Sequence, residues 1–316
     1  MSNFRHLVST DQLERSWVES ELWPCCEQLR QRNGNGYAHS VMGRAMYCLF
    51  YEPSFITRTS FERAMELLGG RAYHTEDASQ FFPFGQTKYI DNVLKMLSSL
   101  HFDLVLLRCS DPGVVEQAQA ADALPVVNGG SYDDHPTQAL ADLYTLHREL
   151  GGIDGAHVAI LGRLEHRNVK ALLKGLALFR DVKVTLIPFS GPVDQTLIAN
   201  CKSKGTSCVT STDIEAVTEV DAIYCNGPTT LSHLQLMKSR NAFNLRIDRQ
   251  FMSMLKDHCV IMDPMQRSGD FEIDVEDRRI AVYRQAENAL FSRMAVLSQM
   301  LPDRQLYPSR VQVLGV

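Results

Sequence analysis

The chain has 316 residues and a mass of 35.6 kDa, about two ordinary domains, and a protein of this size buries roughly three quarters of the surface that its unfolded chain exposes. Hydrophobic residues make up 45% and charged residues 22%, a balance that excludes disordered and fibrous proteins. The formal charge of −5 supplies no basic field for a polyanion, which argues against nucleic-acid binding.

Short runs rich in Val, Ile and Leu alternate along the chain with longer segments of helical periodicity. Such runs are typical of buried strands in parallel sheets. In chain order they cover residues 45–51, 104–107, 124–127, 158–161, 182–187, 222–225 and 260–262. Between them, residues 59–68 and 137–150 carry apolar residues three and four positions apart, which predicts helices with one buried face. The pattern predicts an α/β protein of two domains, each a parallel sheet flanked by helices.

Paired glycines at Gly151 and Gly152 interrupt both patterns and mark the expected boundary between a first domain, 1–150, and a second that begins at 151. Neither a G-x-G-x-x-G after a strand nor a G-x-x-x-x-G-K-[ST] is present, so the sequence gives no support to a nucleotide-cofactor loop.

The eight cysteines include no C-x-x-C pair, which argues against a disulfide framework or a zinc site and favours a reducing compartment. The first residues lack the order of a secretory signal, and no stretch approaches 18 uninterrupted apolar residues. We therefore expect a cytoplasmic protein that does not enter a membrane.

The segment 52–62 follows an apolar strand and continues directly into a helical pattern. A strand-to-helix turn directs free backbone N–H groups and the positive end of the helix dipole at one point, where an anion is stabilised. The hydroxyl groups of Ser54 and Thr57 could add donors to such a site. Ordinary helix capping by these residues is the alternative.

Polar residues also follow two later strands. Arg108 ends an apolar run, and in open α/β sheets ligands collect at the carboxyl ends of the strands. It could hold a phosphate or polarise a carbonyl, or form a surface salt bridge. His135 and Gln138 open a helix; the imidazole could donate to a carbonyl oxygen while the amide accepts from an amino group. That pair suits an amide-like ligand, and a role in caps and buried hydrogen bonds is the alternative.

In this order and at these distances, the segments resemble the aspartate/ornithine carbamoyltransferase family, and more closely its aspartate branch. The family motif F-x-E-P-S-T-R-T-R-x-S-F-E is matched around 52–62, and H-P-T-Q with a following L-x-D-L is matched at 135–143. Residues 283–293 resemble the family's closing helix, Q-A-x-N-G-x-x-x-R. The resemblance covers nearly the whole chain.

The resemblance implies two α/β domains in which the last helix, from about Asn288, returns to the first domain. The first domain would then bind carbamoyl phosphate and comprise 1–150 and 288–316, and the second, 151–287, would bind the second substrate. It also implies small-molecule substrates and a homotrimer with active sites shared between subunits, without a metal or other cofactor.

By the same resemblance, Ser54, Thr57 and Arg108 bind the phosphate of carbamoyl phosphate. His135 polarises the carbonyl with help from Arg108 and Thr57, and Gln138 holds the NH2 group. Such a site transfers an acyl group by positioning and by electrostatic stabilisation of a tetrahedral intermediate. The candidate catalytic residues are therefore Thr57, Arg108, His135 and Gln138.

On the donor side the chain departs from the family. Phe55 and Ile56 stand where the family has a threonine and a phosphate-binding arginine, and losing a charge-assisted clamp costs roughly 1.5 to 3 kcal/mol per hydrogen bond. The family's mobile loop carries a lysine into the neighbouring subunit's site. The best alignment puts Phe84 at that position, with Lys88 nearby.

The acceptor side departs as well. The segment 226–230 offers no cation where the aspartate branch has R-x-Q, although Arg267 is kept in a later loop. Arg167 is a candidate replacement for the family arginine that binds the α-carboxylate, and Arg163 is a new cation where the family has an acid. An aspartate side chain is therefore no longer obviously recognised.

Three hypotheses follow. The favoured one is a carbamoyltransferase-fold enzyme that acts on a carbamoyl, ureido or amide group with an altered donor or amine acceptor, its aromatic residues contacting something less charged than phosphate. The alternative is a catalytically silent relative that serves as a binding or regulatory partner. A true aspartate carbamoyltransferase is the least favoured, because of the missing acceptor cation.

Overall fold

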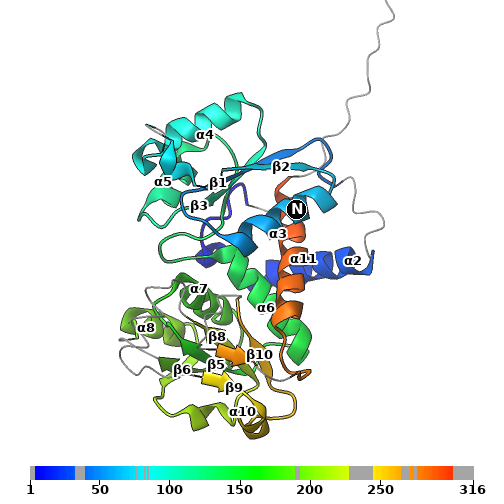
Figure 1. Cartoon of the computed structure of the whole chain (residues 1–316), viewed down its shortest axis with the longest axis vertical. Helices are drawn as coiled ribbons and strands as arrows, with labels where there is room; N and C mark the ends of the chain where they lie inside the picture. The colour runs from blue at the N-terminus through cyan, green and yellow to red at the C-terminus, as the bar shows by residue number, and fades with distance from the viewer. Residues whose placement is uncertain are drawn as a thin grey trace, which may run out of the picture.

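The computed structural model describes residues 4–32, 40–75, 77–81, 83, 85–188, 193–227, 245–264, 271–273 and 276–301. Two parallel sheets form the two halves of the molecule (Figure 1). The first has the order β2-β1-β3-β4, with β1 at Ala45–Phe50, β2 at Arg71–His74, β3 at Leu104–Arg108 and β4 at Val126–Asn128. The second has the order β10-β8-β5-β6-β7, with β5 at His157–Gly162, β6 at Lys183–Pro188, β7 at Ser207–Thr210, β8 at Ala222–Asn226 and β10 at Val260–Met262.

Helices flank both sheets (Figure 1). Those of the first half are α1 (Arg15–Trp17), α2 (Trp23–Gln31), α3 (Phe55–Leu67), α4 (Ile90–Ser99), α5 (Val114–Ala121) and α6 (Pro136–Leu150). Those of the second are α7 (Arg167–Leu176), α8 (Gln195–Ser203) and α10 (Arg249–Met254), and α11 (Val282–Met300) follows. A separate two-stranded parallel sheet pairs β9 (Leu245–Ile247) with β11 (Phe271–Ile273). The shorter elements are η1 (Thr10–Gln12), η2 (Val18–Leu22), η3 (Ala78–Gln80), η4 (Thr87–Tyr89) and η5 (Ile214–Val217).

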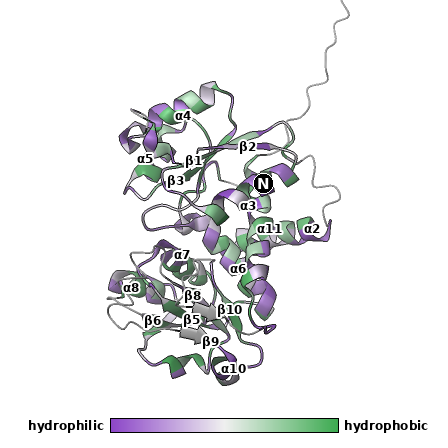
Figure 2. Cartoon of the chain, viewed as in Figure 1, coloured by the Kyte–Doolittle hydropathy of each residue, from purple (hydrophilic) through white to green (hydrophobic). Residues whose placement is uncertain are grey.

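All seven strands expected from the apolar runs are present, within one or two residues of the expected bounds at each end. Most residues of these seven strands are buried. Helix α4 shows both a hydrophobic and a hydrophilic face (Figure 2). The sequence missed the edge strands β2 and β7, because most of their side chains are exposed and neither forms an apolar run. It also missed the three-residue strands β9 and β11.

The predicted return of the C-terminal helix to the first domain is confirmed. Helix α11 packs against α6, α3 and α2, and its buried residues include Met294 and Leu297. It begins at Val282, six residues before the expected start at Asn288. The expected domain division near Gly151 stays a prediction; this glycine ends α6 with a φ of 74°, and the chain then enters β5.

The eight cysteines all lie within the described residues as free thiols, and only Cys25 is not fully buried. No helix in the described part of the chain is long and apolar enough to cross a membrane. Within the same ranges, no group of three or more His, Cys, Asp or Glu side chains is placed to hold a metal ion.

Candidate active site

Three of the predicted site residues lie at the carboxyl ends of the strands of the first sheet. Thr57 is on the first turn of α3, Arg108 is the last residue of β3, and His135 is the N-cap residue of α6. His135 Nε2 lies 3.5 Å from Thr57 Oγ1, and its Nδ1 lies 3.3 Å from Thr137 Oγ1. The structure therefore brings the imidazole and the Thr57 hydroxyl together, both of them buried.

The guanidinium groups of Arg108 and Arg167 approach each other at Gly130. A Cβ atom on this glycine would lie 2.6 Å from Arg108 Nη1 and 3.3 Å from Arg167 Nε, and its φ is 122°. Only glycine fits this backbone conformation beside two guanidiniums. Arg108 Nη1 also donates to the Gly129 carbonyl at 3.0 Å.

Glu52 balances these two positive charges. Its carboxylate pairs with Arg108 Nε at 3.0 Å and with Arg167 Nη2, and it accepts a hydrogen bond from the Ser110 hydroxyl. Burial acts to raise the pKa of Glu52, but the charges of Arg108 and Arg167 outweigh it and hold the pKa below its usual value. Glu52 is not among the site residues that the sequence predicts, although it is the glutamate of the E-P-S motif.

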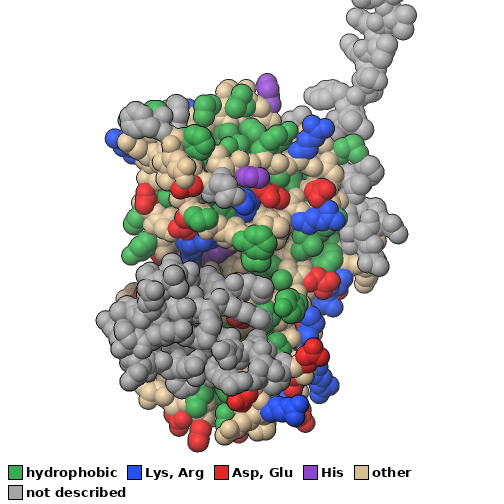
Figure 3. All heavy atoms as spheres, in the orientation of Figure 1, with side chains coloured by type: hydrophobic (Ala, Val, Ile, Leu, Met, Phe, Trp, Pro, Cys, Tyr) green, Lys and Arg blue, Asp and Glu red, His purple; other side chains and the backbone are tan. Residues whose placement is uncertain are grey.

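Arg167 joins the two halves of the molecule. It begins α7, which flanks the second sheet, yet its Nη1 donates to Ser110 Oγ at 2.9 Å and to the Ser131 carbonyl at 2.7 Å, both in the first half. With Glu52, these bonds use much of the guanidinium's donor capacity within the protein. In Figure 3, basic and histidine side chains are visible in the hollow where the two halves meet.

Burial and the positive charges of Arg108, Arg167 and Arg293 lower the pKa of His135 well below its ordinary value. The imidazole is therefore neutral at pH 7 and can donate one hydrogen bond, as carbonyl polarisation needs. Burial and Arg167 lower the pKa of Arg108 to about 9, so its guanidinium is still charged at pH 7.

Gln138 lies in a buried network rather than free in a cavity. Its Nε2 donates to Asp142 Oδ1 at 2.8 Å, and Arg293 Nη2 donates weakly to its Oε1 at 3.4 Å. The amide oxygen can still accept a second hydrogen bond. The structure thus shows the buried hydrogen bonds that were the alternative role for Gln138, and they leave an acceptor for an NH2 group.

The N-terminus of α3 has no side-chain cap. Ser54 occupies the N-cap position, but its hydroxyl makes no capping hydrogen bond, so ordinary capping does not explain it. Phe55 is 74% exposed and Ile56 is half-buried on the first turn. The backbone keeps the form of an anion site, while the side chain at position 56 carries no charge.

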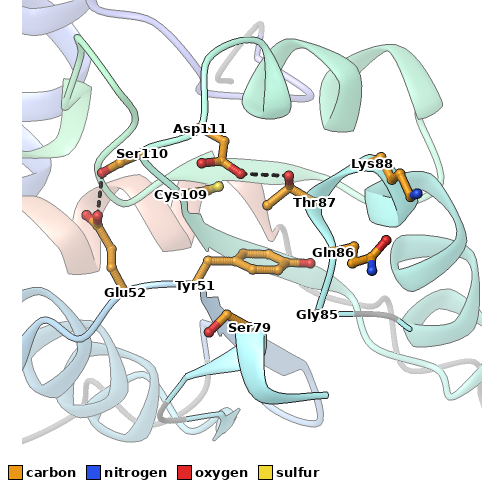
Figure 4. Close-up of a pocket in the computed structure, with 10 residues that line it drawn as sticks. All are labelled: Tyr51, Glu52, Ser79, Gly85, Gln86, Thr87, Lys88, Cys109, Ser110 and Asp111. Atoms are coloured by element: carbon orange, nitrogen blue, oxygen red, sulfur yellow. Dashed lines mark hydrogen bonds between the residues drawn. The ribbon is translucent and has the colours of Figure 1, made fainter. Parts of the chain in front are cut away.

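Lys88 and Arg163 are the other predicted residues that the structure describes. Lys88 lines a cavity of about 360 Å³ with Tyr51, Glu52, Ser110 and Asp111, and Figure 4 shows Lys88 on the side opposite Glu52. Its Nζ lies over the ring of Tyr89, 5.1 Å from the centroid.

On the acceptor side, Arg163 pairs with Glu165 at 2.8 Å. Asn226, at the end of β8, donates to the Arg163 carbonyl, and its buried Oδ1 has no hydrogen-bond partner within the described ranges. Phe84 and Arg267 lie outside the described residues.

Two parallel-sheet domains crossed by a C-terminal helix, with polar side chains at the strand ends, are the architecture of the carbamoyltransferases. Comparisons with known proteins agree. Residues 5–148 match the family model described as aspartate/ornithine carbamoyltransferase, carbamoyl-P binding domain, and residues 154–300 match the Asp/Orn binding domain. The chain therefore belongs to the aspartate/ornithine carbamoyltransferase family, as the resemblance predicted.

Relatives with high coverage carry aspartate carbamoyltransferase names. Aspartate carbamoyltransferase 1, chloroplastic, of Pisum sativum is 30% identical over 93% of this chain and 78% of its own length. The aspartate carbamoyltransferase catalytic subunit of Methanococcus vannielii is 29% identical over 95% of this chain and 99% of its own. Among solved structures, aspartate transcarbamoylase from Trypanosoma cruzi in complex with N-(phosphonacetyl)-L-aspartic acid has a TM-score of 0.83 at 26% identity, covering 94% of this chain and 95% of that one.

Proposed function

We propose that the protein transfers the carbamoyl group of carbamoyl phosphate to the amino group of an amino acid, and that aspartate is the acceptor. The observation that carries the proposal is the neutral, buried imidazole of His135 beside the Thr57 hydroxyl and the charged Arg108, next to the uncapped N-terminus of α3. The names of the relatives support aspartate, although a true aspartate carbamoyltransferase is the least favoured hypothesis from the sequence alone.

In the proposed reaction the donor's phosphate lies at the N-terminus of α3, near Ser54 and Thr57. The acceptor nitrogen attacks the carbonyl carbon, and the negative charge that develops on the carbonyl oxygen is stabilised by His135, Arg108 and the Thr57 hydroxyl. A carbon–nitrogen bond forms, the carbon–oxygen bond to phosphate breaks, and the amine proton leaves with the phosphate. Gln138 accepts from the carbamoyl NH2 and holds it in the plane for attack.

A second candidate, the same transfer to a different amine, is favoured by Asn226. Where the aspartate branch has R-x-Q, this chain ends β8 with a neutral amide whose buried Oδ1 accepts and cannot pair with a carboxylate. An acceptor that carries a hydrogen-bond donor at this point fits better than the second carboxylate of aspartate.

The test is a transfer assay with 14C-labelled carbamoyl phosphate, aspartate and a panel of other amines. Labelled carbamoyl aspartate supports the proposal, whereas product from another amine alone supports the second candidate. Absence of product with every amine contradicts both and favours the silent binding partner. His135→Ala should lower kcat about 100-fold or more, as removal of an oxyanion donor does, and unchanged activity would contradict the role assigned to His135.

A further inference from the structure

A buried carboxylate lies one turn after Gln138 on α6. Asp142 is fully buried and accepts hydrogen bonds from three elements: Gln138 Nε2 on α6 at 2.8 Å, Gln285 Nε2 on α11 at 2.7 Å, and the Tyr224 hydroxyl on β8 at 2.9 Å. A carboxylate that satisfies three buried donors from three elements holds all of them in a single arrangement.

Toward the donor side, Asp142 sets the orientation of the Gln138 amide. An ionised carboxylate only accepts, so the amide nitrogen faces Asp142 and the amide oxygen must point the other way. That oxygen lies 3.4 Å from Arg293 Nη2, and Arg293 also donates to Ser60, one turn after Thr57 on α3. The network thus reaches both helices that carry the candidate donor-binding residues.

Toward the acceptor side, Asp142 holds the ends of two strands of the second sheet. Tyr224 precedes Asn226, the last residue of β8, by two positions. The other arm runs through Gln285, whose Oε1 accepts from the Asp263 backbone N–H at 2.8 Å, one residue after β10 ends. In a parallel sheet these carboxyl ends are where a ligand collects.

We propose that Asp142 is a positioning residue that couples the donor side of the site to the acceptor side, so that each ligand binds more tightly when the other is present. The inference rests on the proposed function and deepens it. Binding of a carbamoyl NH2 to Gln138 Oε1 favours the amide orientation that Asp142 holds, and the same carboxylate fixes the ends of β8 and β10. Such coupling is reciprocal by thermodynamic necessity.

Burial raises the pKa of Asp142 to about 7, although its three donors and Arg293 favour the ionised form. The experiment is therefore done at pH 8, where the carboxylate predominates. It uses phosphonoacetamide, a stable analogue of carbamoyl phosphate, and succinate, which has the two carboxylates of aspartate but no attacking amine. Isothermal titration gives the dissociation constant of phosphonoacetamide with and without succinate.

The decisive variant is Tyr224→Phe, which removes one hydroxyl and keeps the buried ring. Its matched control is Tyr144→Phe, on α6, because that hydroxyl is bonded to Glu27 at 2.6 Å and lies outside the network. In the wild type and the control, succinate should tighten phosphonoacetamide binding roughly fivefold or more. In Tyr224→Phe, and in Asp142→Asn as a second variant, the ratio should fall toward one while the thermal unfolding midpoint shows that the protein is folded.

A ratio near one in the wild type, or a ratio in Tyr224→Phe equal to that of the control, overturns the inference. If the wild type transfers carbamoyl groups to aspartate but shows no such coupling, the inference alone fails. If it neither transfers nor binds phosphonoacetamide, the proposed function fails and the coupling fails with it.

Discussion

The charge state of His135 follows from its surroundings and not from the residue type. Three guanidinium groups act on a buried imidazole, and Glu52 neutralises part of their charge through ion pairs with Arg108 and Arg167. The result is a neutral donor beside two fixed cations, an arrangement that stabilises negative charge developing on an oxygen without any proton uptake in advance.

The neutrality of His135 predicts a signature in stability against pH. Its pKa is lower in the folded protein than the value of about 6.5 in the unfolded chain, so below pH 6.5 only the unfolded chain gains this proton. The free energy of unfolding should fall by up to about 1.4 kcal/mol per pH unit from this group alone. Urea unfolding between pH 7.5 and 5 should show a shallower loss in His135→Gln than in the wild type, and parallel curves would contradict the assignment.

At the scale of single elements, the backbone at the N-terminus of α3 favours anion binding, whereas the side chain at position 56 does not. The uncapped N-terminus directs N–H groups and a positive dipole end toward an anion, but Ile56 adds no cation where the family has arginine. Carbamoyl phosphate should therefore bind weakly, and a single substitution at position 56 should strengthen its binding.

Restoring the cation should tighten donor binding. Ile56→Arg should lower the KM for carbamoyl phosphate about tenfold or more, since a charge-assisted hydrogen bond contributes roughly 1.5 to 3 kcal/mol. Ala120→Arg, at an exposed position on α5, adds the same charge away from α3 and should leave KM unchanged. Steady-state kinetics on both variants give the comparison, and an equal effect of the two would mean that only net charge matters.

Across the whole molecule, the two halves are held together by buried polar contacts as well as by α11. The Arg167 to Glu52 ion pair and the Tyr224 to Asp142 hydrogen bond both join the first half to the second. Large apolar side chains remain exposed on the first half, among them Phe55 at 74% and Phe81 at 58%. Phe55 is on the first turn of α3, next to Thr57, and exposed apolar side chains of this kind are typical of an interface between subunits.

The family resemblance predicts a homotrimer with shared active sites, and two measurements test this prediction. Sedimentation should give three times the monomer mass of 35.6 kDa. Mixed trimers of His135→Ala and Lys88→Ala, formed by dissociation and reassociation, should be more active than either parent, because some sites then receive both intact side chains. If the mixture has only the average of the parents' activities, each subunit holds a complete site or Lys88 has no role.

Local patterns along the chain were enough to place seven strands, including the edge strands β4 and β10, and the residues at their ends. Buried parallel strands require continuous apolar runs, and these stand out against polar connections. Thr57, Arg108 and His135 could be selected in advance because each follows or ends such a run beside a helix. The edge strands β2 and β7 carry no such mark, since most of their side chains face solvent.

Packing between segments far apart in the chain determines the contacts, the charge states and the side-chain orientations at the candidate site. Glu52 is 115 residues from Arg167, and Tyr224 is 82 residues from Asp142, so no spacing in the sequence reveals either contact. The neutral state of His135, the pairing of Arg167 within the protein and the fixed amide of Gln138 all depend on where α7, β8 and α11 lie against α6. Charges and hydrogen bonds act through space, and only the folded chain sets those distances.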